Sequence, residues 1–265
     1  MVNDIKEIKK MIVQHGCHSG HLTSSLGVVE LLYSLYTTIN FNQKNFKNIN
    51  DRDMVIISKE HCRLAQICTL SYLGYVDEKL LDGYMREDGK VGHDMYNIVG
   101  GEEIAAVDYA SGSLGHGLNV GAGLAMAKPE HNIYVVCGDG EFQEGSMWEA
   151  LLFIKQHNLK NLTVIIDRNY LQIDNYTKNI LDTSSNIEKM VQDFGLSVLK
   201  CNGHNIDEIK KCLKEQTNEP KCIIADTIKG KGMEFMLEEL GFAMFHHSML
   251  SEKDIKRVYE AIVNE

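Results

Sequence analysis

The chain has 265 residues, of which 44% are hydrophobic and 24% charged, and its formal net charge is −10. These values are typical of a globular protein with one large or two small domains. The acidic balance and the lack of a basic tract argue against a nucleic-acid partner. No apolar run reaches the roughly 18 residues that span a bilayer, so we expect no membrane segment.

The seven cysteines are an odd number, and none of them forms a CxxC pair. Most lie in apolar segments, which is typical of reduced, buried thiols. Because disulfides are rare in the cytosol, we expect a cytoplasmic protein with free cysteines. These cysteines are at positions 17, 62, 68, 137, 201, 212 and 222.

Helical and strand patterns alternate along the chain. In chain order, hydrophobic periodicity predicts helices over 3–16 and 26–39, a strand over 54–58, helices over 60–74 and 114–127, a strand over 133–137, a helix over 142–157, strands over 162–167 and 196–200, a helix over 205–218, a strand over 222–226 and a helix over 251–263. Strands that are apolar on every residue imply a parallel sheet with helices on both faces. The predicted fold is therefore α/β, with residues 1–265 as a single domain.

Polar loops follow three of these strands. Gly138-Asp139-Gly140 follows the strand at 133–137, Asn169 and Leu171 follow the strand at 162–167, and "DTIKGKG" follows the strand at 222–226. In such sheets, ligands bind beyond the carboxyl ends of the strands. The Asp139 carboxylate, the Asn169 amide oxygen and the Leu171 carbonyl would form half of an oxygen shell for Mg²⁺, which takes its remaining ligands from phosphate and water.

A simpler interpretation of the same residues stays open. Gly-Asp-Gly alone is also typical of a tight turn, and Asn169 could be a helix cap or loop residue. The second ligand and the matching strand context favour the metal site. The helix from about residue 142 would present N-terminal amides near the same edge, which favours a phosphate group.

The wider sequence resembles the N-terminal, thiamine-diphosphate-binding half of transketolase. Gly-Asp-Gly with an asparagine about 30 residues later resembles the thiamine-diphosphate motif, and further stretches follow in the family's order. These are "SGHLTSSLGVVELLYSLY" (19–36), "DRDMVIISKEHCRLA" (51–65), "ASGSLGHGLNVGAGLAMA" (110–127), "GDGEFQEGSMWEA" (138–150), "DRNYLQID" (167–174) and "TIKGKGMEF" (227–235). They cover nearly the whole chain.

The resemblance implies roles for single residues. Asp139, Asn169 and the Leu171 carbonyl would hold Mg²⁺, and the metal would hold the diphosphate. Four histidines match family positions, and histidine can donate to phosphate or hydroxyl groups and exchange protons near neutral pH. His61 and His246 are expected near the diphosphate, and His21 and His93 near the sugar.

Further cofactor contacts are implied at Gly112, Leu114, Gly138, Gly140 and Lys229, although a surface lysine is an equal interpretation for Lys229. Glu144 and Glu149 match acidic positions that the family places at a subunit contact, where they link distant active sites. Helix N-terminal charge is the alternative for both glutamates. Trp148 is interpreted as a packing or interface residue.

Some positions depart from the family pattern. Glu60 and Cys62 flank His61 where the family has small residues, so either His61 is a weaker candidate or Glu60 points away. The stretch from His93 to Gly112 is longer than in the family, which leaves the alignment of His93 open. The choice between His246 and His247 is also open.

The family's cofactor is activated by a glutamate from a second, pyrimidine-binding domain, which this chain does not contain. The sequence therefore predicts one subunit of a two-chain transketolase, with the pyrimidine domain on a separate chain in an α₂β₂ assembly. It would transfer a two-carbon ketol unit from a ketose, expected to be phosphorylated, to an aldose. The alternatives are a decarboxylating subunit of a 2-oxoacid dehydrogenase and a non-catalytic transketolase-like subunit. The identity of the sugars stays open.

Overall fold

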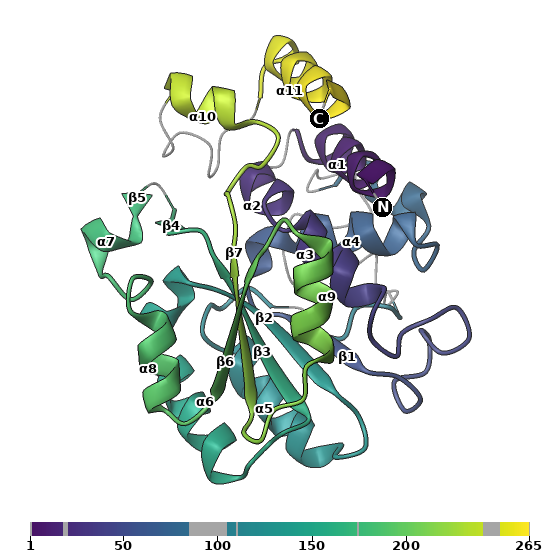
Figure 1. Cartoon of the computed structure of the whole chain (residues 1–265). Coiled ribbons are helices and arrows are strands. Elements are labelled where there is room, and N and C mark those ends of the chain that lie inside the picture. Colours follow the sequence, from purple (N-terminus) through teal and green to yellow (C-terminus); the bar gives the residue numbers. More distant parts are fainter. Residues whose placement is uncertain are drawn as a thin grey trace.

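The computed structural model describes residues 2–17, 21–84, 105–109, 111–173, 175–240 and 250–264. At its centre lies a five-stranded parallel sheet with the strand order β1-β2-β3-β7-β6 (Figure 1). The strands are β1 (Met54–Ile57), β2 (Ile133–Gly138), β3 (Leu162–Arg168), β6 (Ser197–Asn202) and β7 (Lys221–Asp226). A parallel sheet brings all of the carboxyl strand ends to one edge of the molecule.

Helices cover both faces of this sheet. The core on one face contains residues of α3 (Val29–Tyr36), α4 (Arg63–Tyr72) and α9 (Ile206–Lys214), together with α1 (Val2–Gly16), which packs on α4. The core on the other face contains residues of α5 (Gly117–Ala127), α6 (Gly145–Gln156) and α8 (Ile187–Asp193). Neighbouring strand residues alternate between the two cores, since Val55 and Ile57 belong to the first and Met54 and Ile56 to the second. The predicted α/β fold with helices on both faces is confirmed.

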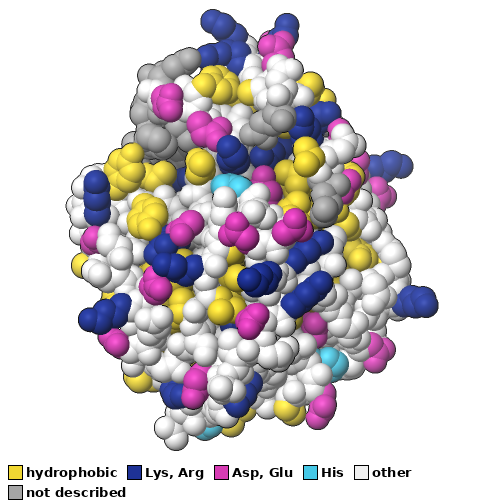
Figure 2. Space-filling view, in the orientation of Figure 1, with side chains coloured by type: hydrophobic (Ala, Val, Ile, Leu, Met, Phe, Trp, Pro, Cys, Tyr) yellow, Lys and Arg dark blue, Asp and Glu magenta, His cyan; other side chains and the backbone are white. Residues whose placement is uncertain are grey.

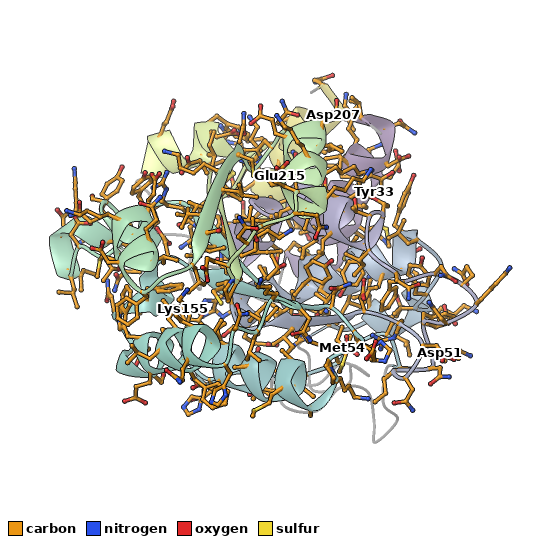
Figure 3. The ribbon with its side chains drawn as sticks, turned by 60° about the horizontal axis from the view of Figure 1, so that its bottom comes forward. Tyr33, Asp51, Met54, Lys155, Asp207 and Glu215 are labelled. Carbon is orange, nitrogen blue, oxygen red and sulfur yellow. The ribbon has the colours of Figure 1, made fainter. Side chains whose placement is uncertain are left out.

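Shorter elements complete the described chain. They are α2 (Leu22–Leu26), the 3₁₀ turns η1 (Glu60–Cys62), η2 (Glu78–Leu81) and η3 (Gly140–Gln143), the two-residue strands β4 (Leu171–Gln172) and β5 (Asn175–Tyr176), and α7 (Thr177–Ile180), α10 (Glu234–Leu240) and α11 (Glu252–Asn264). Figure 3 shows the side chains, with Met54 at the start of β1, Lys155 near the end of α6 and Asp207 and Glu215 at the two ends of α9.

The helix predicted over 26–39 is present as the shorter α3, because Leu26 belongs to α2 and the chain breaks between the two helices. At the break, a Cβ atom on Gly27 would lie 2.9 Å from the carbonyl oxygen of Ile228. Glycine therefore lets the loop after β7 approach α2 closely. The predicted helix from residue 142 also starts later, since η3 precedes α6, which begins at Gly145.

The surface carries charges of both signs. On the face in Figure 2, basic and acidic side chains are interspersed. Within the described residues, no helix combines the length and apolar character that crossing a bilayer requires. All seven cysteines are buried and free, as the sequence predicted.

Candidate active site

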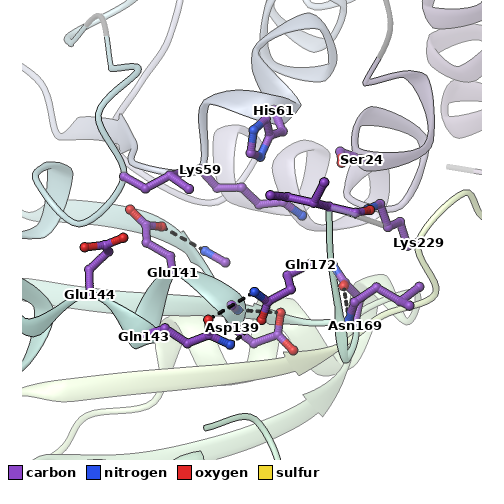
Figure 4. Close-up of a pocket in the computed structure, with 15 residues that line it drawn as sticks. Ser24, Lys59, His61, Asp139, Glu141, Gln143, Glu144, Asn169, Gln172 and Lys229 are labelled. Atoms are coloured by element: carbon purple, nitrogen blue, oxygen red, sulfur yellow. Dashed lines mark hydrogen bonds between the residues drawn. The ribbon is translucent and has the colours of Figure 1, made fainter. Parts of the chain in front are cut away.

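A pocket of about 190 Å³ lies at the carboxyl edge of the sheet, where β1, β2, β3 and β7 end. Figure 4 shows Ser24, His61 and Lys229 facing Asp139 and Asn169 across it. The residues that line it are Ser24, Lys59, His61, Leu114, Gly138, Asp139, Gly140, Glu141, Gln143, Glu144, Asn169, Leu171, Gln172, Ile173 and Lys229. Segments that are distant in sequence therefore meet around one cavity.

Asp139 is the central carboxylate of this pocket, and it is 1% exposed. Its oxygens accept hydrogen bonds from the backbone N–H groups of Gly140 (3.0 Å) and Tyr170 (2.8 Å). Burial, together with the nearby carboxylate of Asp167, raises the pKa of Asp139 to about 6. The ionised carboxylate is thus costly in this position, which is typical of a site that receives a cation.

Asp167 is a second buried carboxylate beside Asp139. It forms an ion pair with Lys59 and accepts a hydrogen bond from the hydroxyl of Thr227. Burial lowers and the charge of Asp167 raises the pKa of Lys59, and the net shift is upward. Because Lys59 compensates one of the two carboxylates, the pocket keeps a negative charge at Asp139.

Asn169 lies one residue from the backbone N–H that binds Asp139. Its Nδ2 donates to Asp167 Oδ2 (3.1 Å), and its Oδ1 accepts from the N–H of Leu171 (3.0 Å). The loop that carries Asn169 and Leu171 is therefore held against Asp139 by the Tyr170 bond. The structure brings together the three residues that the sequence predicted as metal ligands.

Glu141 connects two loops of the pocket. Its carboxylate accepts from the N–H of Gly115 (2.8 Å), the N–H of Gly138 (3.1 Å) and the hydroxyl of Ser58. Burial raises its pKa despite these bonds. The glycine-rich loop at 111–116 and the Gly-Asp-Gly turn are thereby fixed relative to each other.

Comparisons with known proteins identify the family of this chain. Residues 1–263 match the family described as "Transketolase, thiamine diphosphate binding domain". The chain belongs to this family. It is 35% identical to a subunit of the apulose-4-phosphate transketolase of Actinobacillus succinogenes, over 98% of this chain and 95% of that protein. It is 34% identical to the 6-deoxy-6-sulfo-D-fructose transketolase subunit SqwG of a Clostridium species, over 88% and 85% of the two chains.

A solved transketolase from Campylobacter jejuni superposes with a TM-score of 0.80 at 29% identity. The superposition covers 99% of this chain but 42% of that one, so the chain spans less than half of that transketolase. The resemblance found in the sequence is thus confirmed. Each of these relatives is named a transketolase, which agrees with the predicted transketolase subunit rather than with a 2-oxoacid dehydrogenase component.

The transketolase histidines are only partly described. His61 lines the pocket, and its ring lies 4.6 Å from that of His21, which does not itself line the cavity. His93 and the pair His246 and His247 lie outside the described residues. The structure therefore brings His21 and His61 together, and their roles stay predictions.

The other predicted transketolase contacts divide into two groups. Leu114, Gly138, Gly140, Glu144 and Lys229 line the pocket. Gly112 and Glu149 do not line it, and Glu149 is exposed on α6. Trp148 packs against Phe142 and Phe194, with ring centroids 5.4 and 5.2 Å apart, so it is a packing residue here.

Glu60 points away from the pocket. Its two carboxylate oxygens accept from Arg63 Nε (2.9 Å) and Nη2 (2.7 Å), and one also accepts from the hydroxyl of Ser111. Of the two options that the sequence left open, the structure therefore favours the one that keeps His61 as a pocket residue.

Six lining residues were not singled out from the sequence as site residues, namely Ser24, Lys59, Glu141, Gln143, Gln172 and Ile173. Gln143 and Gln172 are hydrogen-bonded to each other, with Gln172 Nε2 donating to Gln143 Oε1 at 3.0 Å. Lys59 and Glu141 had a usable signal, because each is a charged residue shortly after a predicted buried strand.

Proposed function

We propose that this chain is the Mg²⁺- and diphosphate-binding subunit of a two-component, thiamine-diphosphate-dependent transketolase. The observation that carries the proposal is the buried Asp139 carboxylate, which faces a pocket at the carboxyl edge of the sheet together with Asn169 and Leu171. Membership of the family and the subunit names of the relatives support it.

The residues of the pocket fit a magnesium ion. The proposed ligands are the Asp139 carboxylate, the Asn169 amide oxygen and the Leu171 carbonyl, an all-oxygen set of the kind that Mg²⁺ prefers. The raised pKa of Asp139 supports the assignment, because a divalent cation would compensate the charge that Lys59 leaves unbalanced.

The diphosphate would lie between this metal and the cationic side of the pocket. Lys229 is buried on that side, and His61 faces the same cavity (Figure 4). Gly138 and Gly140 allow close backbone approach, and the 12-residue helix α6 starts nearby with Glu144 as its N-cap. Gly112 and Leu114 are proposed to contact the cofactor rings.

When bound, thiamine diphosphate supplies an electron sink that stabilises a carbanion on the transferred two-carbon unit. This chain's part is to anchor and orient the cofactor and to place polar groups beside the sugar. His21 and His93 are proposed for the sugar hydroxyls, and His246 for the diphosphate end. Glu149 is proposed to contact a neighbouring subunit.

A second chain completes the proposed enzyme. It carries the pyrimidine-binding domain with the glutamate that activates the cofactor, and the two chains form a cytoplasmic α₂β₂ assembly. Two relatives that this chain matches over 95% and 85% of their own length are named as transketolase subunits, which supports this division of labour. The free, buried cysteines agree with a reducing compartment.

The substrates would be a phosphorylated or similarly anionic ketose as donor and an aldose as acceptor. The two relatives named above act, by their names, on a sugar phosphate and on a sulfo sugar, which supports an anionic donor. We propose that residues around the rim of the pocket, rather than those that bind the cofactor, determine which sugar is accepted.

Reconstitution tests the two-chain proposal. The purified chain is assayed for ketol transfer alone and after mixing with a chain that resembles the C-terminal half of transketolase. We expect turnover only in the mixture. Turnover by this chain alone at the rate of the mixture would contradict the proposal.

A titration tests the metal site. Mg²⁺ and thiamine diphosphate are titrated into the complex that contains either the parent chain or Asp139→Ala, with Asp193→Ala, at an exposed position of α8, as the matched control. We expect the loss of measurable binding for Asp139→Ala alone. Equal affinity of all three would remove the proposed site.

A further inference from the structure

The loop after β7 places Lys229 in the pocket. Two backbone hydrogen bonds hold this loop. The N–H of Thr227 donates to the carbonyl of Arg168 (3.0 Å), and the N–H of Gly230 donates to the carbonyl of Thr23 (2.8 Å). Lys229 lies between these points and extends to the carbonyl of Ile173 (3.3 Å). The position of its ammonium therefore depends on the backbone at Ile228.

That backbone is held by a histidine from another loop. The N–H of Ile228 donates to Nε2 of His204 at 2.8 Å. The side chain of Ile228 is 45% exposed, so apolar burial contributes little to fixing this residue. The hydrogen bond from the Ile228 N–H to His204 therefore helps to anchor the backbone before Lys229, as the Gly230 bond to Thr23 does after it.

The His204 ring is itself held in one tautomer. Because a backbone N–H can only donate, Nε2 accepts and the proton resides on Nδ1. Nδ1 lies 3.1 Å from Oε2 of Glu30, and Oε1 of Glu30 lies 3.2 Å from the ammonium of Lys9. Lys9 and Glu30 are buried, which fixes the ring and its proton in place.

The turn between β6 and α9 brings His204 to this position. The N–H of Gly203 donates to the carbonyl of Asp226 at 2.7 Å. A Cβ atom on Gly203 would lie 2.4 Å from Cγ2 of Thr227. The sequence Asn202-Gly203-His204 thus lets the turn contact the very start of the loop that carries Lys229.

We propose that His204 is a positioning residue for the cofactor site, which holds the Ile228 amide and thereby aims Lys229 at the diphosphate. The inference rests on the proposed function, because it assigns Lys229 to that ligand. His204 itself does not line the pocket.

Two substitutions of His204 test its two hydrogen bonds, to Ile228 and to Glu30, separately. His204→Gln keeps an acceptor near the Nε2 position and so retains the bond to Ile228. His204→Asn keeps a donor near the Nδ1 position for Glu30 but has no group that reaches Ile228. His157→Asn, at an exposed histidine that follows α6, is the matched control. His204→Ser, whose hydroxyl is also too short to reach Ile228, replaces the asparagine variant if that variant does not fold.

Hydrogen exchange of the Ile228 amide and calorimetric binding of thiamine diphosphate with MgCl₂ are measured on the two-chain complex. The loss of one hydrogen bond corresponds to a change of about three- to tenfold in an equilibrium constant. We expect His204→Asn to speed exchange and to weaken cofactor affinity by about that factor, and His204→Gln and His157→Asn to stay within about twofold of the parent.

Unchanged exchange in His204→Asn would overturn the anchoring contact, and faster exchange with unchanged affinity would overturn its link to the cofactor. Equal loss in the asparagine and glutamine variants would also contradict the proposal. If the parent complex does not bind thiamine diphosphate while Ile228 responds as expected, the proposed function fails, and the assignment of Lys229 fails with it.

Discussion

Two buried ionic clusters lie near each other at the carboxyl edge of the sheet, and they differ in how completely their charges are compensated. In the first, Glu60 binds Arg63 through both carboxylate oxygens, at 2.9 and 2.7 Å. In the second, Lys59 pairs with Asp167, while the carboxylate of Asp139 lies nearby with a raised pKa. The first cluster lies outside the pocket, and the second lies against it through Lys59 and Asp139.

We interpret the difference as one between a structural use of buried charge at Glu60 and the metal-binding use proposed for Asp139. The Glu60 cluster is complete within the fold, so it can hold the chain near Ser111 without a ligand. Asp139 keeps a raised pKa of about 6, which means that folding places it in an unfavourable environment. Such unfavourable groups are common where a ligand supplies the missing partner.

The strongest test of this comparison breaks the complete cluster. Arg63→Met leaves Glu60 buried without its partner, and we expect the free energy of unfolding to fall by about 3–5 kcal/mol. Chemical denaturation measures the change. Arg257→Met, which removes a more exposed pair with Asp254 (3.5 Å) on α11, is expected to cost at most about 1 kcal/mol. If Arg63→Met lowers the free energy of unfolding by less than about 1 kcal/mol, the comparison is contradicted.

Adding the missing partner should stabilise the second cluster. With thiamine diphosphate and Mg²⁺ at about 100 times their dissociation constant, opening at the Gly140 and Tyr170 amides should cost about 2.7 kcal/mol more. These amides donate to Asp139, and hydrogen exchange of the two-chain complex reports on them. The complex with Asp139→Asn should show no slowing. Equal slowing in both complexes would mean that the ligand binds elsewhere.

Removing the uncompensated charge should stabilise the metal-free chain. Because the pKa of Asp139 is raised from 3.8 to about 6, the folded state binds more protons than the unfolded state between these values. The free energy of unfolding therefore falls as pH rises through this window. We expect Asp139→Asn to match the parent near pH 4 and to exceed it by about 2 kcal/mol at about pH 7.

Denaturation in the presence of a chelator at several pH values measures this difference, with Asp193→Asn as the control. A variant that is less stable than the parent at neutral pH would show that the carboxylate is favourable in the folded chain without metal.

The smallest expected effect concerns a neutral member of the complete cluster. The hydroxyl of Ser111 contacts the carbonyl of Ile57 and the carboxylate of Glu60. Ser111→Ala should lower the free energy of unfolding by about 1 kcal/mol, because Arg63 still compensates Glu60. Ser113→Ala, at an exposed position in the same loop, should be neutral in the same denaturation experiment. No difference between the two variants would argue against a role for Ser111 in the cluster.

The central residues of the site were predictable because their signal is local. Asp139 and Asn169 each follow a continuous apolar run, and parallel strands bring such positions to one edge. Lys59 and Asp167 form a pair across 108 residues, which depends on which strands become neighbours. The order β1-β2-β3-β7-β6 is a tertiary property that periodicity does not encode.

The position of Glu60 shows a different limit. Its neighbour His61 was expected in the pocket near the diphosphate. Because Glu60 is next to His61 in the sequence, its carboxylate could have faced the same anionic ligand. In the 3₁₀ turn η1, successive side chains point about 120° apart, and residues three apart lie above each other. Glu60 therefore faces Arg63 rather than the direction of His61. Helix α8 was missed because only Ile187 and Val191 of its seven residues are buried, too few for a periodic signal.

The register of the two central strands has a consequence for the evolution of such enzymes. Gly138 of β2 is paired with Asp167 of β3, so the segments that carry Asp139 and Asn169 leave the sheet side by side. Adjacent strands lie about 4.8 Å apart whatever their side chains. If Asp139 and Asn169 hold the metal as proposed, mutations in the surrounding loops can change the accepted sugar while the spacing of these two residues stays constant. New substrate preferences can then arise without rebuilding the proposed cofactor site.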